Sequence, residues 1–186
     1  MARLVELEPK RLGLIRELLP NAKTIALLVN PTEPFAETQA HDVQAAARAI
    51  GQNVTILKAG TVRDIDAAFA SLAQMRADAL LIATTPFFFV RAAQFVVLAV
   101  RYAIPTLYFR REFVAAGGLI SYGSNPDESY GVAGAYVGRI LKGEKPADLP
   151  IQLPTKFELV INLSTARALS LDVPTTMLAR ADEVIE

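Results

Sequence analysis

The sequence predicts an α/β fold in which a parallel sheet carries helices on both faces. Short aliphatic runs alternate with helical segments from residue 24 onward, beginning with TIALLV at 24–29. These runs are apolar at nearly every position, which is typical of strands buried on both faces of a parallel sheet. With 52% hydrophobic residues among 186, the chain has enough apolar material for one core. We therefore expect one domain with an appendage.

The elements follow one another in a regular order. Strands are expected at residues 24–29, 53–59, 78–83, 104–109, 118–123 and 157–163. Helices are expected within 31–51, at 63–75, from Pro86 onward, at 111–118, at 126–142 and at 164–171, before a polar tail ending in ADEVIE. Gly51 and Gly117 end their helices, and Pro86 suits a first helical position after a Thr85 cap.

The helix at 126–142 differs from the others. It is followed by EKPADLPIQLPT, whose three prolines neither a helix nor a sheet interior tolerates. It therefore lies between an exit from the sheet and a return to it, and we expect it to pack elsewhere. The alternative, in which the helix folds onto its own sheet, stays open. Its apolar side consists of Tyr130, Ala133, Tyr136, Val137, Ile140 and Leu141.

Composition excludes several classes of function. Lys plus Arg and Asp plus Glu number 19 each, so no overall charge attracts nucleic acid. The absence of cysteine excludes disulfides, thiolate metal sites and cysteine nucleophiles. The N-terminal segment is too charged for a signal peptide, so we expect no export signal in this chain. The longest apolar stretch, at 86–100, is interrupted by Arg91 and Gln94 and is too short to span a bilayer.

No catalytic, metal or cofactor site is predicted. Neither GxGxxG nor GxxxxGK[ST] follows any strand, so nucleotide binding is not expected. The single histidine, His41, falls within a helix, where exposure to solvent is the ordinary case. Acidic pairs such as Asp64 with Asp66 fall in helices or polar ends rather than at strand ends. We therefore expect a protein that is not an enzyme and carries no cofactor or metal.

Hydrogen-bonding residues instead gather where the predicted strands end. In an open parallel sheet ligands bind beyond the carboxyl ends of the strands. The candidate ligand-binding residues there are Asn30, Thr32, Glu33, Thr84, Thr85, Phe87, Phe88, Phe109, Arg110 and Tyr122. Thr32 and Thr85 have a simpler alternative role as helix caps, which is compatible with ligand contact.

The run PFFFV at 86–90 is the most suggestive of these segments. Three adjacent helical residues fan around the axis and cannot share one buried stripe. We expect Phe87 and Phe88 at the rim of a cleft and Phe89 turned toward the sheet, where aromatic walls suit a flat or apolar ligand. Burial of all three rings is the alternative. Likewise, Arg110 beside Phe109 could receive a carboxylate or simply pair with Glu112.

Several long motifs resemble a known family. PKRLGLIRELLP, IALLVNPTEP, REFVAAGGLISYG and YVGRILKGEKPADLPIQLPTKFELVINL are similar to the substrate-binding proteins of bacterial ABC importers, in the group often described as tryptophan/tyrosine-type. The resemblance runs from about Leu7 to Glu186. It implies a flavodoxin-like lobe of a type I periplasmic binding protein, which closes with a second lobe around a ligand.

The resemblance also implies a division of the chain. Residues 10–123 and 154–186 would form the ligand-binding lobe, and 124–153 would be a crossover helix and connector belonging to the first lobe. That first lobe and an export signal would precede Leu4, and this sequence does not carry them. The ligand loops would fall at 30–34, at 85–88 and near 109–110. Many relatives have an aspartate where this chain has Thr85, so amine recognition by that loop is not implied.

Three functions compete. The first is the solute-binding component of an importer, located in the periplasm or lipid-anchored outside the cytoplasm, with a transporter permease and an aromatic or aliphatic amino acid or carboxylate as partners. The second is a small-molecule sensor domain of a regulator, which needs a further module. The third is an α/β enzyme, for which no acid, base or cofactor loop is found. The apolar side of the 126–142 helix further predicts a homodimer through Tyr130, Tyr136, Val137 and Ile140.

Overall fold

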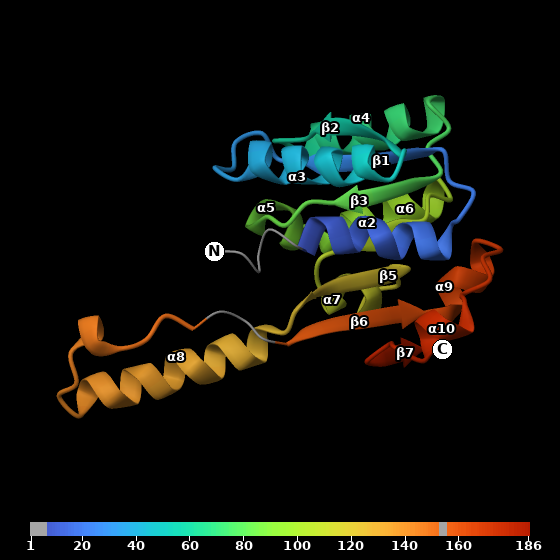
Figure 1. Ribbon diagram of the computed structural model, residues 1–186. Helices are drawn as coiled ribbons and strands as arrows, with labels where there is room; N and C mark the ends of the chain where they lie inside the picture. Colours follow the sequence, from blue (N-terminus) through green and yellow to red (C-terminus); the bar gives the residue numbers. More distant parts are fainter. Residues whose placement is uncertain (1–6, 153–155) are drawn as a thin grey trace.

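The strands of the chain form a single mixed sheet. The computed structural model describes residues 7–152 and 156–186, without the side chains of residues 126–128. In this part of the chain seven strands are arranged in the order β2-β1-β3-β4-β5-β6-β7 (Figure 1). They are β1 (Thr24–Val29), β2 (Asn53–Lys58), β3 (Ala79–Ile82), β4 (Thr106–Tyr108), β5 (Ile120–Ser124), β6 (Phe157–Asn162) and β7 (Glu183–Ile185). The pairs are parallel apart from β5 with β6, which is antiparallel.

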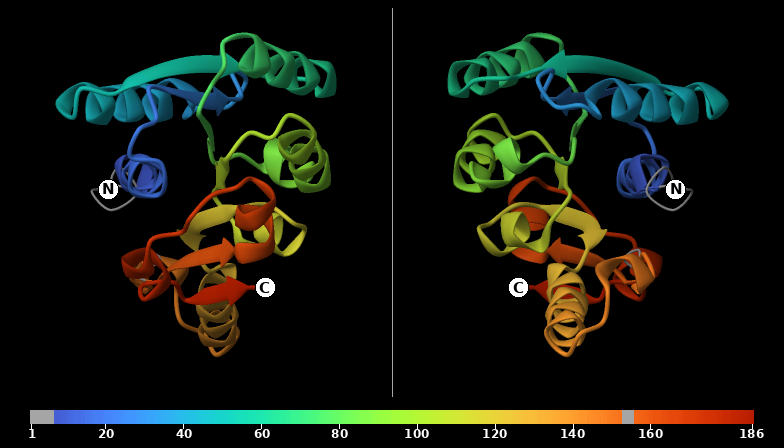
Figure 2. Two further views of the ribbon diagram at one scale, coloured as in Figure 1. Left: turned by 90° about the vertical axis from the view of Figure 1, so that its right-hand side faces the viewer. Right: turned by 90° about the vertical axis from the view of Figure 1, so that its left-hand side faces the viewer.

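Helices cover both faces of this sheet, as Figure 2 shows. They are α2 (Leu7–Leu18), α3 (Ala36–Ala49), α4 (Val62–Gln74), α5 (Pro86–Phe89), α6 (Ala92–Arg101), α7 (Arg111–Ala115), α8 (Pro126–Leu141), α9 (Leu163–Ala168) and α10 (Thr175–Leu178), with a short 3₁₀ turn at Pro146–Asp148. One apolar core lies under α2, α3 and α10, and the other under α4, α6 and α7. The predicted α/β fold with two helical layers is thus confirmed.

Strand β1 shows why the sheet needs two covers. Successive side chains of a strand point to opposite faces, and in β1 both sets are apolar. Leu27 belongs to the core under α2 and α3, whereas Leu28 belongs to the core under α4 and α6. Both side chains are completely buried. Such a strand is stable only between two layers of helices.

Helix α4 forms where its sequence predicts. Thr61 and Asp64 make a capping box, in which the Thr61 hydroxyl accepts from the Asp64 N–H (3.2 Å) and the Asp64 carboxylate accepts from the Thr61 N–H (2.9 Å). Its apolar stripe, which includes Ile65 and Phe69, is fully buried. The cap and the stripe together explain its boundaries and its orientation.

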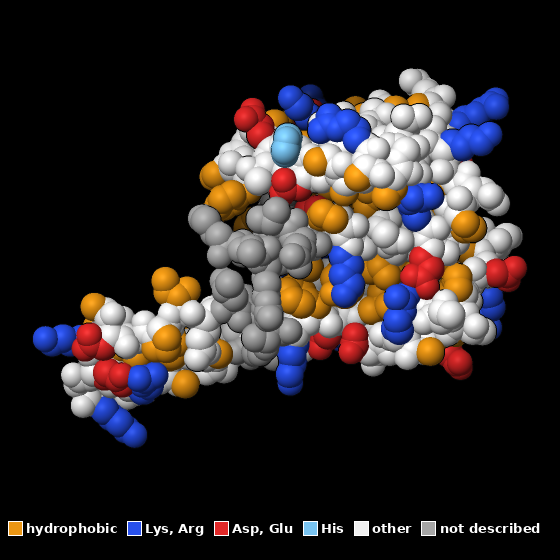
Figure 3. All heavy atoms as spheres, viewed as in Figure 1, with side chains coloured by type: hydrophobic (Ala, Val, Ile, Leu, Met, Phe, Trp, Pro, Cys, Tyr) orange, Lys and Arg blue, Asp and Glu red, His pale blue; other side chains and the backbone are white. Residues whose placement is uncertain are grey.

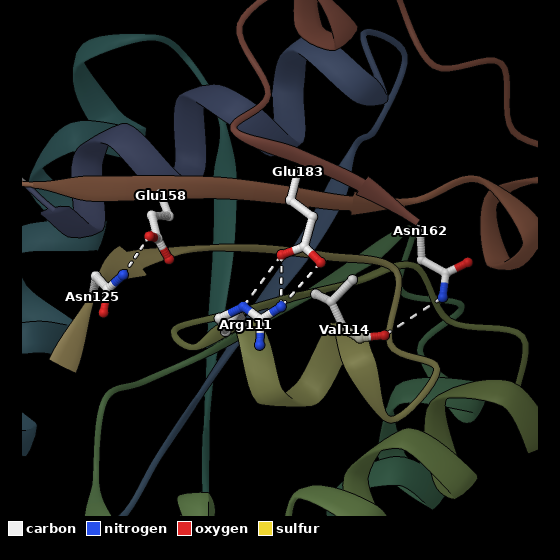
Figure 4. A network of polar contacts seen from close by, with 6 residues as sticks. All are labelled: Arg111, Val114, Asn125, Glu158, Asn162 and Glu183. Carbon is white, nitrogen blue, oxygen red and sulfur yellow. Dashed lines mark hydrogen bonds and ion pairs between the residues drawn. The ribbon is translucent and has the colours of Figure 1, made fainter. Parts of the chain in front are cut away.

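The C-terminal tail is a strand, contrary to the expected polar extension. Residues Glu183–Ile185 add β7 to the edge of the sheet, parallel to β6. Arg111 holds it through a two-pronged ion pair with Glu183, with nitrogen–oxygen distances of 2.7 to 3.2 Å (Figure 4). The Asp182 carboxylate also accepts from the Leu159 N–H (2.8 Å). These polar contacts order a segment whose few apolar residues did not predict a strand.

Two other boundaries differ from the prediction. The helix expected from Pro86 onward is interrupted, so that the one-turn α5 and α6 are separate. Helix α3 begins only at Ala36, and the five preceding residues, 31–35, form a loop after β1. His41 on α3 is exposed, as expected. No helix in the described ranges combines the length and the apolar character that a membrane span requires.

Helix α8 projects away from both helical layers (Figure 1). Its apolar side chains are exposed, with Tyr130 at 73%, Val137 at 56% and Leu141 at 82%. Hydrophobic side chains are visible on the surface of the projecting segment in Figure 3. The Tyr136 hydroxyl donates to the Pro150 carbonyl (2.6 Å), so the returning segment lies beside the helix. In this structure α8 therefore does not cover its own sheet.

Candidate functional site

The candidate site lies at the edge where β1 and β3 end. Strand β1 is flanked by β2 on one side and β3 on the other, so the chain leaves β1 in one direction and later returns on its opposite side. At such a point the loops diverge, and ligands of open α/β sheets bind between them. Asn30 directly follows β1, and the loop holding Thr84 and Thr85 follows β3. The predicted polar residues thus lie at the position where this fold leaves room for a ligand.

Hydrogen bonds join these two loops. The Asn30 side chain is buried, and its Oδ1 accepts from the Thr32 N–H (3.1 Å) and the Thr32 hydroxyl (2.9 Å). The Thr85 hydroxyl donates to Glu33 Oε1 (3.1 Å) across the gap between the strands. The Glu33 N–H donates to the Asn30 carbonyl (3.1 Å), so four of the predicted residues form one network. Thr32 is no helix cap, because α3 begins four residues later.

The loop after β3 is held by its own cap. The buried Thr85 hydroxyl accepts from the Phe87 N–H (3.0 Å) at the start of α5, so the alternative role of Thr85 as a cap is confirmed. Thr84 is exposed, and its carbonyl accepts from the Gln39 side chain (3.2 Å). The two threonines therefore have different roles: Thr85 caps α5, whereas Thr84 is exposed and its hydroxyl accepts from Arg11 Nη1 (2.9 Å).

The three phenylalanines are buried to different degrees. Phe88 is fully buried and packs edge-on against Phe95, with ring centroids 5.1 Å apart. Phe87 is half-buried, and the Arg91 guanidinium lies 3.9 Å from its ring centroid. Phe89 is half-buried as well. The expectation that Phe88 lies at the rim is wrong, because the single turn of α5 directs residue 88 into the core under α4 and α6. The half-buried Phe87 and Phe89 rings pack against the same core.

Phe109 and Arg110 are engaged within the protein. Phe109 is 4% exposed and packs edge-on against Phe113 at 5.1 Å. Arg110 makes a two-pronged contact with Glu112 (2.9 and 3.2 Å), and its guanidinium carbon lies 4.8 Å from the Phe89 ring centroid. The alternative in which Arg110 pairs with Glu112 is confirmed. Phe109 belongs to the core.

The Tyr122 side chain lies on the face of the sheet that α2 covers, beneath the first turn of that helix. It is 7% exposed and stacks on Phe157 at 6.1 Å, with the Lys10 ammonium 4.8 Å from its ring centroid. Where β5 and β6 end their pairing, Asn125 donates to Glu158 (2.5 Å), as Figure 4 shows. Tyr122 is therefore separated from the network of Asn30, and its side chain supports the region where the chain leaves the sheet.

The prediction missed Arg11, the largest fully buried side chain among the described residues. Its Nε donates to the Tyr122 carbonyl (2.8 Å), and its Nη1 donates to Glu8 (2.7 Å) and to the Thr84 hydroxyl (2.9 Å). Arg11 thus joins α2 to the ends of β3 and β5. The signal in the sequence is the Glu8–Arg11 pair, three residues apart, on the side of the helix that also carries buried leucines.

Burial makes this ion pair unusual. It raises the pKa of the Glu8 carboxyl and lowers the pKa of the Arg11 guanidinium, and the attraction between the two opposes both shifts. Glu8 Oε2 is buried and has no hydrogen-bond partner within the described ranges. The desolvation cost of such a pair offsets much of the attraction between its two charges.

Gly123 shapes the edge next to Arg11. A Cβ at this position would lie 1.9 Å from the Phe109 carbonyl oxygen, so only glycine allows β4 and β5 to approach this closely. The same Cβ would lie 3.5 Å from Arg11 Nη2. The Phe109 backbone fills the space beside Gly123, so the chain that follows β4 packs directly against the end of β5 next to Arg11.

The chemistry available at the edge is that of binding. It presents hydroxyls, an amide, the Glu33 carboxylate and the Phe87 ring, which can hold a small organic molecule by hydrogen bonds and ring contact. In the described part of the chain, no three His, Cys, Asp or Glu side chains gather to hold a metal ion.

Comparisons with solved structures agree with this fold. A conserved domain protein from Vibrio cholerae is 25% identical with a TM-score of 0.86, over 95% of this chain and 60% of its own. An ABC domain from Streptococcus pneumonia, solved in complex with L-Trp, is 25% identical with a TM-score of 0.86, over 96% of this chain and 62% of its own. A ligand-free, open substrate-binding protein from Clostridium difficile shares the fold at 23% identity, with a TM-score of 0.69 over 95% of this chain and 59% of its own.

This chain therefore spans about three fifths of the length of these relatives. Among curated proteins no match was found. The family model described as ABC transporter substrate binding protein matches residues 5–185, which is nearly the whole sequence. The chain belongs to the ABC transporter substrate-binding protein family.

Proposed function

We propose that this chain supplies a ligand-binding lobe of the solute-binding component of an ABC importer. Its ligand is a small organic molecule such as an aromatic or aliphatic amino acid or carboxylate. Binding takes place against the edge formed by the ends of β1 and β3 and involves no catalytic step. The family match and the L-Trp complex of the relative from Streptococcus pneumonia support this assignment.

One observation carries the proposal. The loops after β1 and β3 are joined by the hydrogen bond from Thr85 to Glu33, and they present the half-buried Phe87 ring beside it. A carboxylate therefore stands next to Thr85, although residue 85 itself is uncharged. An ammonium group of a ligand finds an acceptor in Glu33, and an aromatic side chain finds a flat partner in Phe87.

The arrangement of α8 fits a two-lobed protein. We assign residues 10–123 and 154–186 to the ligand-binding lobe and residues 124–153 to another lobe. The exposed Tyr130, Val137 and Leu141 support this division, because a helix with such a surface normally packs against a further part of a protein. A permease partner and a location outside the cytoplasm, in the periplasm or on a lipid anchor, follow from the same assignment.

Isothermal calorimetry with a panel of amino acids and aromatic acids tests the proposal. We expect saturable binding of at least one member and, at a hundredfold excess over Kd, stabilisation of about 2.7 kcal/mol in unfolding. Mass spectrometry should recover the ligand unchanged. The variant Glu33→Gln should bind an amino acid at least tenfold more weakly, whereas Val97→Ala, on an exposed position of α6, serves as the control. Chemical conversion of the ligand, or no binding to the wild-type chain, would contradict the proposal.

We also propose that the isolated chain forms a homodimer through α8. Tyr130, Val137 and Ile140 are exposed, and Tyr136 lies on the same side of the helix. Burial of these side chains against a second copy removes apolar surface from water, which favours association. Light scattering at high protein concentration should give the mass of two chains, and Val137→Glu should give that of one. A wild-type monomer at every concentration would overturn this expectation.

A further inference from the structure

Thr84 has an unused hydrogen-bond donor at the candidate site. The residue is exposed in the loop after β3, directly before Thr85. Its hydroxyl oxygen accepts from Arg11 Nη1 (2.9 Å), and its carbonyl accepts from the Gln39 side chain (3.2 Å). Among the residues that the structure describes, no acceptor is found for the hydrogen of the Thr84 hydroxyl.

Arg11 fixes the direction of this hydrogen bond. A guanidinium carries only N–H donors, so the Thr84 oxygen can only accept at this contact. Arg11 is 2% exposed and is held by Glu8 and by the Tyr122 carbonyl, so the donor stays in place. The hydroxyl hydrogen of Thr84 is therefore directed away from Arg11 and is available to another acceptor.

The other two threonines at this edge offer no such donor. The Thr32 hydroxyl donates to Asn30 Oδ1 (2.9 Å), and the Thr85 hydroxyl donates to Glu33 Oε1 (3.1 Å). Both hydrogens are thus used within the protein. A hydrogen bond from a cation also polarises the hydroxyl that accepts it, which makes that hydroxyl a stronger donor. Of the three hydroxyls, that of Thr84 is therefore the one suited to a negatively charged oxygen.

We propose that the Thr84 hydroxyl donates a hydrogen bond to the carboxylate of the ligand, and that Arg11 is the positioning residue that holds it as a donor. This inference rests on the proposed function and extends it, because it narrows the ligand class to molecules with a free carboxylate. With Glu33 as the acceptor for an ammonium group, the two loops offer one donor and one acceptor to an α-amino acid. Arg11 does not contact the ligand in this arrangement, since it is buried and acts through Thr84.

The test compares L-tryptophan with tryptamine, which share the indole ring and the ammonium group and differ in the carboxylate. Calorimetry on the full chain gives the ratio of the Kd of tryptamine to the Kd of L-tryptophan. We expect a ratio of at least ten in the wild-type chain and a fall of about tenfold in Thr84→Val, because a hydrogen bond to a charged group is lost. Thr84→Ser keeps the hydroxyl and should keep the ratio. Thr24→Val, at the amino end of β1, is the matched control and should also leave the ratio unchanged.

The positioning role of Arg11 is measured by the same ratio. Arg11→Met should lower the ratio as Thr84→Val does, because the hydroxyl is no longer held as a donor. When both substitutions are combined, the ratio should fall no further than in Thr84→Val alone. A purely structural role of Arg11 would weaken binding of both compounds equally and leave the ratio at its wild-type value, which would overturn this part of the inference.

The outcomes separate the inference from the proposed function. If the wild-type chain binds L-tryptophan and the ratio is unchanged in Thr84→Val, the role of Thr84 is overturned and a substrate-binding function stands. No binding of either compound would contradict the proposed function and the inference with it. Circular dichroism at the temperature of the calorimetry checks the folding of each variant. If Thr84→Val does not fold, NMR on the wild-type chain decides: the methyl signal of Thr84 should shift more with L-tryptophan than with tryptamine, and equal shifts would overturn the inference.

Discussion

Replacing Arg11 by methionine is expected to lower the free energy of unfolding by about 3–5 kcal/mol, because it leaves one member of a buried ion pair without its partner. The guanidinium is 2% exposed and holds the Glu8 carboxylate, the Tyr122 carbonyl and the Thr84 hydroxyl. Methionine has similar volume but no donor, so three acceptors lose their hydrogen bond inside the protein.

A double variant separates the charge from the packing. Glu8→Gln combined with Arg11→Met removes both charges, and we expect it to be more stable than Arg11→Met alone. Urea denaturation of the wild-type chain, Glu8→Gln, Arg11→Met and the double variant measures the coupling between Glu8 and Arg11. Arg16→Met, on the same helix, is the control for the loss of an arginine. A loss below about 1 kcal/mol in Arg11→Met would show that the pair is not needed for stability.

The stability of Arg11→Met should also depend on pH. Burial raises the pKa of Glu8 above its ordinary value of 4.5, and Arg11 opposes that shift, so the pKa should rise further in Arg11→Met. An acid whose pKa is raised in the folded state contributes stability at low pH and loses it as the pH rises through the folded pKa. The deficit of Arg11→Met should therefore be smaller below pH 4.5 than at pH 7.

Replacing Phe88 by alanine is expected to lower the free energy of unfolding by about 3–5 kcal/mol, whereas Phe87→Ala should mainly weaken ligand binding. Phe88 is fully buried and contacts Phe95 at 5.1 Å, so its removal leaves a cavity in the core under α4 and α6. Phe87 is only half-buried, and its ring contacts both that core and the Arg91 guanidinium.

Thermal unfolding and calorimetry on the two variants test this division between neighbouring residues. A large loss of stability in Phe87→Ala together with a small loss in Phe88→Ala would contradict the orientation of α5. Phe89→Ala provides a third point, since Phe89 is half-buried and packs against Phe113 at 6.3 Å.

The sheet was predictable where strands are apolar throughout. The runs at β1 and β3 are buried on both faces, so their composition alone indicates a covered parallel sheet. The direction of β6 was not predictable, because it depends on the path of residues 125–156. Strand β7 has three residues and depends on the Arg111–Glu183 pair, and no local pattern indicates such a distant contact.

The candidate site shows the same contrast. Asn30 and Thr85 could be placed at the edge because they immediately follow apolar strands, and the ends of parallel strands meet at one edge. Arg11 could not, because its partners at residues 8, 84 and 122 come together only in the folded chain. The orientation of Phe88 depends on the single turn of α5, which a helical period of the sequence does not specify.

Amide-resolved NMR with L-tryptophan as the probe tests the central claim most directly. In a titration of the ¹⁵N-labelled chain, we predict that the largest saturable shifts fall on the amides at the ends of β1 and β3, which are those of Asn30, Thr32, Glu33, Thr84, Thr85 and Phe87. Largest shifts at the opposite edge of the sheet, next to α9 and α10, would contradict the account, as would a spectrum that does not change at millimolar ligand.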